Sequence, residues 1–236
     1  MVKLPDRFLE WNYYARRRLL ERLLRGERVD SAKLFLEFTR HNPVLCTAAP
    51  RADGTVEVNG KVVGVGYVVR KERISETIEA FREHIRATDE KYEEAKDDPE
   101  KLRELRREHS LRGLRLLLRY VYLPKREAEK VIDFERLATI ELAKRLPWSS
   151  KHTWRIVQKN KHACLVFFQP PSVSFEVRGI LTIHDGDEYH ELVTLIHDAY
   201  HYTPPEHRAG RPVYILNVTE VYDNSPSRSG FGTRLA

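Results

Sequence analysis

Six side chains that suit a phosphate group are crowded together just before an apolar run. Residues 149–168 read SSKHTWRIVQKNKHACLVFF, and the polar side chains at the start of this segment are Ser149, Ser150, Lys151, His152, Thr153 and Arg155. A bound phosphate needs a cation and several converging hydrogen-bond donors, and the first turn of a helix supplies donors from its backbone. The segment therefore predicts an anion site where a short helix begins, followed by a buried strand.

A simpler interpretation of the same residues is a capped surface helix. Ser149 or Ser150 would accept hydrogen bonds from the first N–H groups of a helix over 151–159, and the cations would remain solvated. Residue types alone do not distinguish this capped helix from a phosphate site.

The segment 187–201, DEYHELVTLIHDAYH, places several polar residues on one stripe of a predicted helix. Steps of four, three and four residues nearly complete whole turns and align His190, Thr194, His197 and His201. His197 and His201 could share a metal ion, but the glutamate of an HExxH motif is missing. The opposite face carries Leu192, Leu195, Ile196 and Ala199. We therefore expect the stripe to face solvent or a partner subunit, and we predict no metal site.

Other motifs of enzyme sites are missing from the sequence, which has no nucleophile elbow, Ser-His-Asp order or phosphate-binding P-loop. Gly64 and Gly66, in VGVGYVV, lack the third glycine and the following helix of a dinucleotide site, which favours a bulge or close strand packing. Cys46 and Cys164 each lie in an apolar run, so two buried free thiols are expected rather than a disulfide or a cysteine-rich metal site.

Composition places the chain among globular proteins. It has 236 residues, of which 41% are hydrophobic, enough for a substantial core. No apolar run approaches membrane-spanning length and the N-terminus does not read as a signal peptide, so we expect a cytoplasmic protein. Charged residues make up 32% of the chain and there is a single methionine, a composition typical of thermophiles.

The net charge of +6 keeps nucleic-acid binding open as an alternative, with Arg16, Arg17 and Arg18 as the contact surface. Over 82–109, however, basic and acidic residues alternate. That pattern is typical of a salt-bridged helix surface rather than of a basic stripe.

Apolar periodicity predicts helices at the N-terminus and strands after them. A first helix is expected over 6–24, and a second is expected to begin at Asp30 or Ser31. From residue 43, three short strands should follow, joined by turns at 53–54 (Asp-Gly) and 59–60 (Asn-Gly).

The period of 3.6 residues returns over 72–130, where Asp-Asp-Pro at 97–99 should separate two helices. The segment 134–146, FERLATIELAKRL, fits either a helix or a strand. Beyond it we expect strands at 162–168, 174–183 and 211–221, with a helix after Asp-Gly at 185–186.

This order of elements resembles the flavin-binding split-barrel superfamily, which includes pyridoxamine phosphate oxidases and haem-utilisation proteins. The resemblance rests on three segments, LEFTRHNPVLCTAAPRADGTVEV, SSKHTWRIVQKNKHACLVFF and SFEVRGILTIHDGDEYHELVTLIHDAYH. It implies a homodimer that binds flavin mononucleotide (FMN) and transfers electrons or a hydride to a small organic substrate. It also implies that a Ser/Thr-Lys/Arg or His-Thr pair holds the flavin phosphate, and both Ser150-Lys151 and His152-Thr153 fit that pattern.

The sequence departs from the superfamily in two places. The second strand of the first hairpin would carry basic residues that face the cofactor, whereas TVEVNGKVV offers only Lys61. The helical segment 72–130 stands where the superfamily passes directly from strand to strand.

Together these patterns predict an α+β protein built on an antiparallel split β-barrel. Residues 1–42 would form N-terminal helices packed on the barrel, 43–71 and 131–223 the barrel itself, 72–130 a helical insertion and 224–236 a flexible tail. The expected function is that of an FMN-binding oxidoreductase. The alternatives are a non-catalytic module for a flavin or haem-type ligand and a basic nucleic-acid-binding protein.

Overall fold

The computed structural model describes residues 1–141, 151–208, 211–228 and 230–236. The helices are α1 (Asp6–Leu9), a π-helical turn (Glu10–Tyr14), α2 (Ala15–Leu24), α3 (Ser31–Thr39), α4 (Ile74–Ala95), α5 (Pro99–Tyr120), α6 (Lys125–Val131), α7 (His152–Lys159) and α8 (Glu188–Asp198). The strands are β1 (Val44–Pro50), β2 (Val56–Val62), β3 (Gly66–Val69), β4 (Ile132–Ile140), β5 (His162–Gln169), β6 (Val173–His184), β7 (Val213–Asp223) and β8 (Thr233–Arg234).

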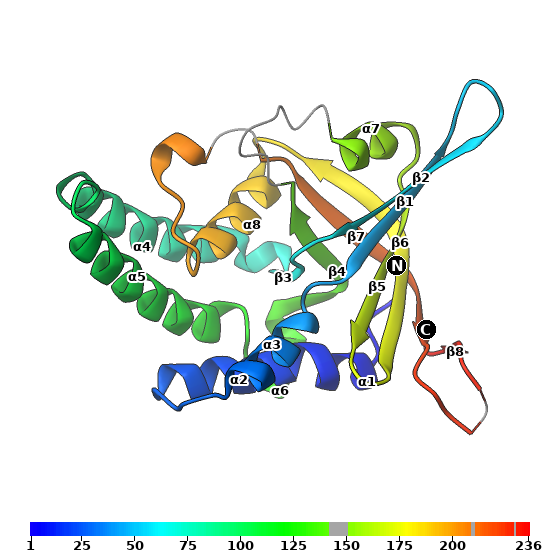
Figure 1. Ribbon diagram of the computed structural model, residues 1–236, viewed down its shortest axis with the longest axis horizontal. Coiled ribbons are helices and arrows are strands. Elements are labelled where there is room, and N and C mark those ends of the chain that lie inside the picture. The colour runs from blue at the N-terminus through cyan, green and yellow to red at the C-terminus, as the bar shows by residue number, and fades with distance from the viewer. Residues whose placement is uncertain (142–150, 209–210, 229) are drawn as a thin grey trace.

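The strands form one antiparallel sheet in the order β2-β1-β5-β6-β7-β4-β3, with β8 paired to β7. Its two edge strands, β2 and β3, are joined only by residues 63–65. Because a chain advances at most about 3.6 Å per residue, the joined ends of these strands lie within about 14 Å of each other. The sheet therefore curls into an open barrel (Figure 1). The expected fold class, an α+β protein with an antiparallel split barrel, is confirmed.

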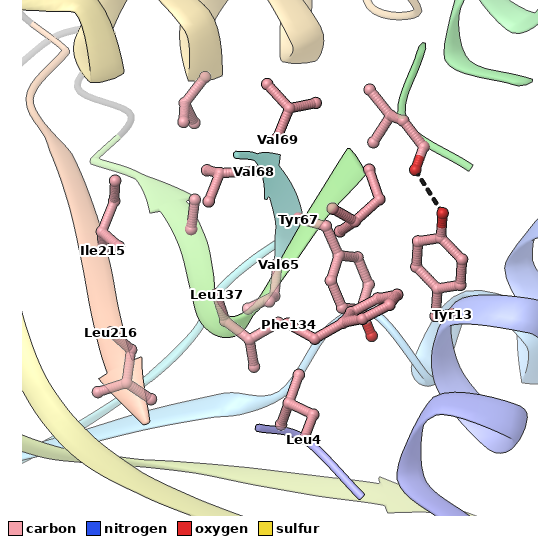
Figure 2. Close-up of a cluster of buried hydrophobic side chains, with 14 of the residues drawn as sticks. Leu4, Tyr13, Val65, Tyr67, Val68, Val69, Phe134, Leu137, Ile215 and Leu216 are labelled. Carbon is pink, nitrogen blue, oxygen red and sulfur yellow. Dashed lines mark hydrogen bonds between the residues drawn. The ribbon is translucent and has the colours of Figure 1, made fainter. Parts of the chain in front are cut away.

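Buried tyrosines join the N-terminal helices to the barrel. The hydroxyl of Tyr13 donates to the carbonyl oxygen of Val121 (2.6 Å), the dashed line in Figure 2, and accepts from the N–H of Leu123 (2.7 Å). The hydroxyl of Tyr67 on β3 donates to Oδ1 of Asn12 (2.7 Å). A buried hydroxyl without a partner is costly, so these bonds fix where the first helix lies.

The hairpin formed by α4 and α5 packs against α8, which lies between the hairpin and the sheet (Figure 1). Two stacked, buried histidines of the hairpin satisfy the last carbonyl groups of α8. His84 donates from Nε2 to the carbonyl oxygen of Ala199 (3.0 Å), and His109 donates from Nε2 to that of Asp198 (2.7 Å). These carbonyls have no partner within the helix, so the hairpin caps α8.

Three local expectations differ from the structure or are decided by it. The turn expected at 59–60 is wrong, because β2 runs straight through Asn59 and Gly60 and pairs with β1 along its whole length. An Asn-Gly pair favours a turn locally, and here cross-strand pairing overrides that preference. The ambiguous segment at 134–146 continues β4 as far as Ile140. The segment 224–236 was expected to be a flexible tail, but its described residues include β8, which pairs with β7, and Ala236, whose carbonyl oxygen accepts from the N–H of Val221 (3.1 Å).

The glycines and cysteines of the strands lie in ordinary structural positions. The pairing of β3 with β4 shifts register between Gly66 and Val68, which confirms a bulge at the second glycine of VGVGYVV.

Cys46 and Cys164 are free and half-buried, and they face each other across β1 and β5. Burial, assisted by the carboxylate of Glu176, raises the pKa of the Cys164 thiol to about 12. Such a thiol is a poor nucleophile at neutral pH.

None of the described helices combines the length and the apolar content needed to cross a bilayer.

Gly113 lets α5 approach α8 so closely that no side chain fits between them. A Cβ atom at this position would lie 1.6 Å from the carbonyl oxygen of Ala199. We expect Gly113→Ala to lower the free energy of unfolding by about 2 kcal/mol, because an overpacking cost of about 3 kcal/mol outweighs the roughly 1 kcal/mol that alanine gains in helix propensity. Gly66→Ala is the control, since a Cβ there would meet no atom within 4 Å. Urea unfolding measures the free energy of unfolding of both variants. If Gly113→Ala is as stable as the wild type, the close contact of α5 with α8 is contradicted.

Candidate functional site

Two side-chain contacts fix how α7 lies on β2. Glu57, Asn59 and Lys61 share one face of β2, because side chains alternate along a strand. Asn59 donates from Nδ2 to Oγ1 of Thr153 (3.1 Å), and Nη2 of Arg155 lies 3.9 Å from Oε1 of Glu57. Later residues of the helix thus contact earlier residues of the strand, so the two run antiparallel. The N-terminus of α7 therefore points toward Lys61.

The first turn of α7 offers hydrogen-bond donors to a ligand. Lys151 is the N-cap residue, and its side chain cannot accept hydrogen bonds from the helix. The capped-helix interpretation gave this position to Ser149 or Ser150, and both serines lie outside the described residues. The first N–H groups of a helix have no partner within the helix. Those of α7, together with the ammonium group of Lys151, suit an anion.

The other predicted residues of α7 have different environments. Thr153 is buried, and the hydrogen bond that it accepts from Asn59 holds α7 on the sheet. His152 and Arg155 are exposed, and Arg155 already has Glu57 as an ion-pair partner. Among the predicted residues that the structure describes, Lys151 is therefore the cation at the start of the helix.

Lys61 adds a second cation, and a buried carboxylate accompanies it. Lys61 forms an ion pair with Glu141, whose side chain is 1% exposed just beyond β4. Glu141 also accepts a hydrogen bond from the hydroxyl of Tyr214 (3.3 Å). Burial, and then the adjacent Glu141, raise the pKa of Tyr214, so its hydroxyl stays protonated at neutral pH. An ammonium group has three N–H donors, which leaves Lys61 free to contact a ligand as well. We call Lys61, Lys151 and the first turn of α7 the α7 site.

A separate cavity of about 390 Å³ lies between the N-terminal helices, strands β3 and β4, and helices α5 and α8. Much of its wall is apolar or aromatic, with contributions from Phe38, Tyr67, Leu117, Tyr122, Ile140 and Ile196. Arg16, His41 and Thr139 also line it, and each has a buried polar atom without a hydrogen-bond partner among the described residues. None of these three residues was predicted from the sequence to form a pocket.

Two histidines of the α8 stripe line this cavity as well. His197 is half-buried there, and His201 lies beside it with the ring centroids 5.5 Å apart. For His197, the expectation that the stripe faces open solvent is wrong, because the N-terminal helices and the β3–β4 pair enclose the cavity that this side chain lines. Contact of the stripe with a partner subunit stays a prediction. In the described part of the chain, no group of three or more His, Cys, Asp or Glu residues is arranged to hold a metal ion.

Comparison with solved structures gives remote similarities to one group of folds. A NimC/NimA family protein from Clostridium acetobutylicum is 11% identical, with 91% of this chain and 98% of that chain covered and a TM-score of 0.36. A pyridoxamine 5'-phosphate oxidase-related, FMN-binding protein from Nostoc punctiforme is 11% identical, with 83% and 82% covered and a TM-score of 0.33. A haem-binding protein from Mycobacterium smegmatis is 10% identical, with 88% and 57% covered and a TM-score of 0.36.

The chain thus has a remote resemblance to the pyridoxamine 5'-phosphate oxidase-like split barrels. No protein-family model matches the chain, and no curated protein matches its sequence. At these TM-scores the similarity does not identify a ligand for this chain.

Asp198, at the end of α8, should make stability depend on acid pH. It accepts two hydrogen bonds from the guanidinium of Arg211 (2.9 and 2.8 Å) and one from Thr203 (2.8 Å). Burial alone would raise the pKa of Asp198, but the hydrogen bonds from Arg211 and His197 outweigh burial and lower the pKa to about 2. The depressed pKa means that Asp198 stabilises the fold above about pH 4 and loses this contribution as the pH falls toward 2.

We therefore expect Asp198→Asn to cost about 3 kcal/mol at neutral pH and to flatten the fall in stability between pH 4 and 2. Asp97→Asn, at an exposed position, is the control and should leave that slope unchanged. Thermal unfolding across this pH range checks both variants, and an unaltered slope in Asp198→Asn would show that other carboxylates cause the acid sensitivity.

Proposed function

We propose that the protein binds a flavin of the FMN type by its phosphate, at the α7 site. The observation that carries this proposal is the antiparallel packing of α7 on β2, which directs the N-cap Lys151 and the first N–H groups of α7 toward Lys61. A flavin phosphate needs convergent donors and cations, and this donor set fits it. The resemblance to flavin-binding split barrels implies a phosphate-binding pair in this segment, either Ser150-Lys151 or His152-Thr153.

Each residue of the site would have a distinct role. Lys151 would pair with the phosphate, and the α7 N–H groups would donate to its oxygens. Lys61 would contribute a further N–H donor while Glu141 holds its ammonium group in place. Asn59 and Thr153 would keep α7 in position. A bound flavin supplies hydride and single-electron transfer from its ring, and the protein contributes binding, orientation and control of solvent.

The proposal includes an oxidoreductase activity on a small organic substrate. The alternative is a module that binds a flavin or haem-type ligand without turnover. Reduction of the loaded protein by a nicotinamide nucleotide, followed by reoxidation with an added electron acceptor, separates the two, because a binding module would not cycle. The nucleic-acid alternative has little local support, since Arg16 lines the cavity while Arg17 and Arg18 have the acidic partners Glu21 and Glu10.

Lys151→Ala should weaken FMN much more than riboflavin, which has the same ring and no phosphate. Loss of one charge-assisted contact, worth about 1.5 to 3 kcal/mol, should raise the FMN dissociation constant roughly ten- to one-hundred-fold. Lys159→Ala is the control, because it removes the same charge from the other end of α7. It should change the FMN dissociation constant less than about twofold. Calorimetric titration with both ligands measures these constants. Equal losses for FMN and riboflavin, or no binding of either by the wild type, would remove the phosphate assignment.

We also propose a homodimer formed through the face of β2 opposite to α7. Val56, Val58 and Val62 are exposed on that face, beside an open groove bounded by β1, β5 and β6. Contiguous exposed apolar residues on an edge strand are typical of an interface.

The dimer can be tested with two variants at equally exposed apolar residues. Val58→Lys should shift the protein toward monomer in light scattering, because a buried lysine would oppose association. Phe231→Lys is the control, because its exposed fraction, 75%, matches the 76% of Val58. A monomeric wild type, or a dimer unaffected by Val58→Lys, would contradict this interface.

A further inference from the structure

The cavity between the N-terminal helices and α8 contains a cation, Arg16, that has no acidic partner among the residues that the structure describes. Nε and Nη1 of Arg16 are buried and have no hydrogen-bond partner among the described residues. The guanidinium lies over the ring of Phe38, 5.2 Å from its centroid, and contacts the hydroxyl of Tyr122. No aspartate or glutamate belongs to the described residues that line the cavity. A buried charge without a counter-charge is unfavourable, and arginine cannot lose its proton to relieve it.

His41 and His201 add polarity to the cavity without adding charge. Burial, and then the charges of Arg16 and Arg40, hold the pKa of His41 well below its usual range. Burial, and then His197 and Arg16, lower the pKa of His201 to about 4. Both rings are therefore neutral at neutral pH. Arg16, as the fixed cation of the cavity, suits one negative charge on a ligand.

Two further unpartnered atoms point to an organic ligand rather than a simple ion. His41 is 7% exposed and Thr139 is 6% exposed, and their Nε2 and Oγ1 atoms have no hydrogen-bond partner among the described residues. The remaining wall is largely apolar and includes the flat rings of Phe38, Tyr67 and Tyr122. A volume of about 390 Å³ lies at the lower end of the usual range for ligand pockets. Such a wall favours a small planar ring.

We infer that this cavity binds a compact aromatic monocarboxylate, with the carboxylate on Arg16 and the ring against the aromatic wall. His41 and Thr139 supply hydrogen bonds to a polar substituent on the ring. The site is independent of the proposed flavin site, because Arg16, His41 and Thr139 lie outside the α7 site and carry the binding without it.

Benzoate and benzyl alcohol make a matched pair of probes, because they share a ring and differ in charge. In calorimetric titrations at neutral pH, we expect the wild type to bind benzoate at least about tenfold more tightly than benzyl alcohol, as loss of a charge-assisted contact implies. Arg16→Gln should abolish most of this difference. Arg18→Gln is the control, because Arg18 lies on the same helix but is exposed and pairs with Glu10, and it should retain the difference.

Each other result overturns the assignment. If benzyl alcohol binds as tightly as benzoate, or if Arg18→Gln loses as much as Arg16→Gln, the Arg16 contact is wrong. If sulfate binds as tightly as benzoate, the aromatic ring contributes nothing and only an anion site remains. If benzoate does not bind saturably, the cavity is not a site for this class. Should Arg16→Gln fail to fold, the comparison of benzoate with benzyl alcohol on the wild type still decides whether the cavity prefers a carboxylate.

Discussion

The link between β2 and β3 is the constraint on which both candidate sites depend. Residues 63–65 are too few to let the two edges of the sheet separate, so the sheet must curl until β2 approaches the β3–β4 pair. That curl brings Lys61, just before the link, to Glu141, just after β4. The link residues Gly64 and Val65 themselves form part of the cavity wall. The α7 site thus includes a residue just before this short connection, and the cavity wall includes the connection itself.

The helical hairpin converts the open side of this barrel into an enclosed surface. It caps α8 through His84 and His109, and α5 contributes Leu117 to the cavity. Burial lowers the pKa of His109 to about 4, so at neutral pH the ring is neutral and donates its one N–H, at Nε2, to the α8 backbone. The segment that departs most from the split-barrel pattern is therefore the one that holds α8 over the cavity.

Sequence reasoning succeeded where a local signal and the tertiary structure agree. The period of 3.6 residues and Asp98-Pro99 define α4 and α5, and an alternating pattern defines β6. It failed at Asn59-Gly60, where the turn preference of two residues lost to strand pairing over the full length of β2. Glu141 was missed because the segment after Phe134 fitted both a helix and a strand.

Arg16 was misinterpreted for a different reason: its helical spacing was informative, but the residue was assigned to an exposed basic cluster. It was grouped with its neighbours as a basic cluster, although its spacing from Leu9, Tyr13 and Leu20 puts it on the buried stripe of the helix. A basic residue on an apolar stripe indicates a buried charge, and only the arrangement of α3, α5 and α8 reveals that it faces a cavity. The three-dimensional neighbours of such a residue come from distant parts of the chain, so spacing alone cannot supply them.

The charges at the α7 site limit what it can hold. Lys61 and Lys151 contribute two positive charges, and Glu141 removes one of them. A helix N-terminus adds the equivalent of roughly half a positive charge. The total nearly matches the roughly −1.5 to −2 charge of a single phosphate monoester at neutral pH. A second phosphate group would find no further compensation among these charges, so under the proposed function the ligand would be a mononucleotide flavin rather than a dinucleotide. Without Glu141, the two lysines and the helix N-terminus would carry more positive charge than one phosphate monoester can balance. The buried acid beside the site is therefore consistent with the binding of one phosphate.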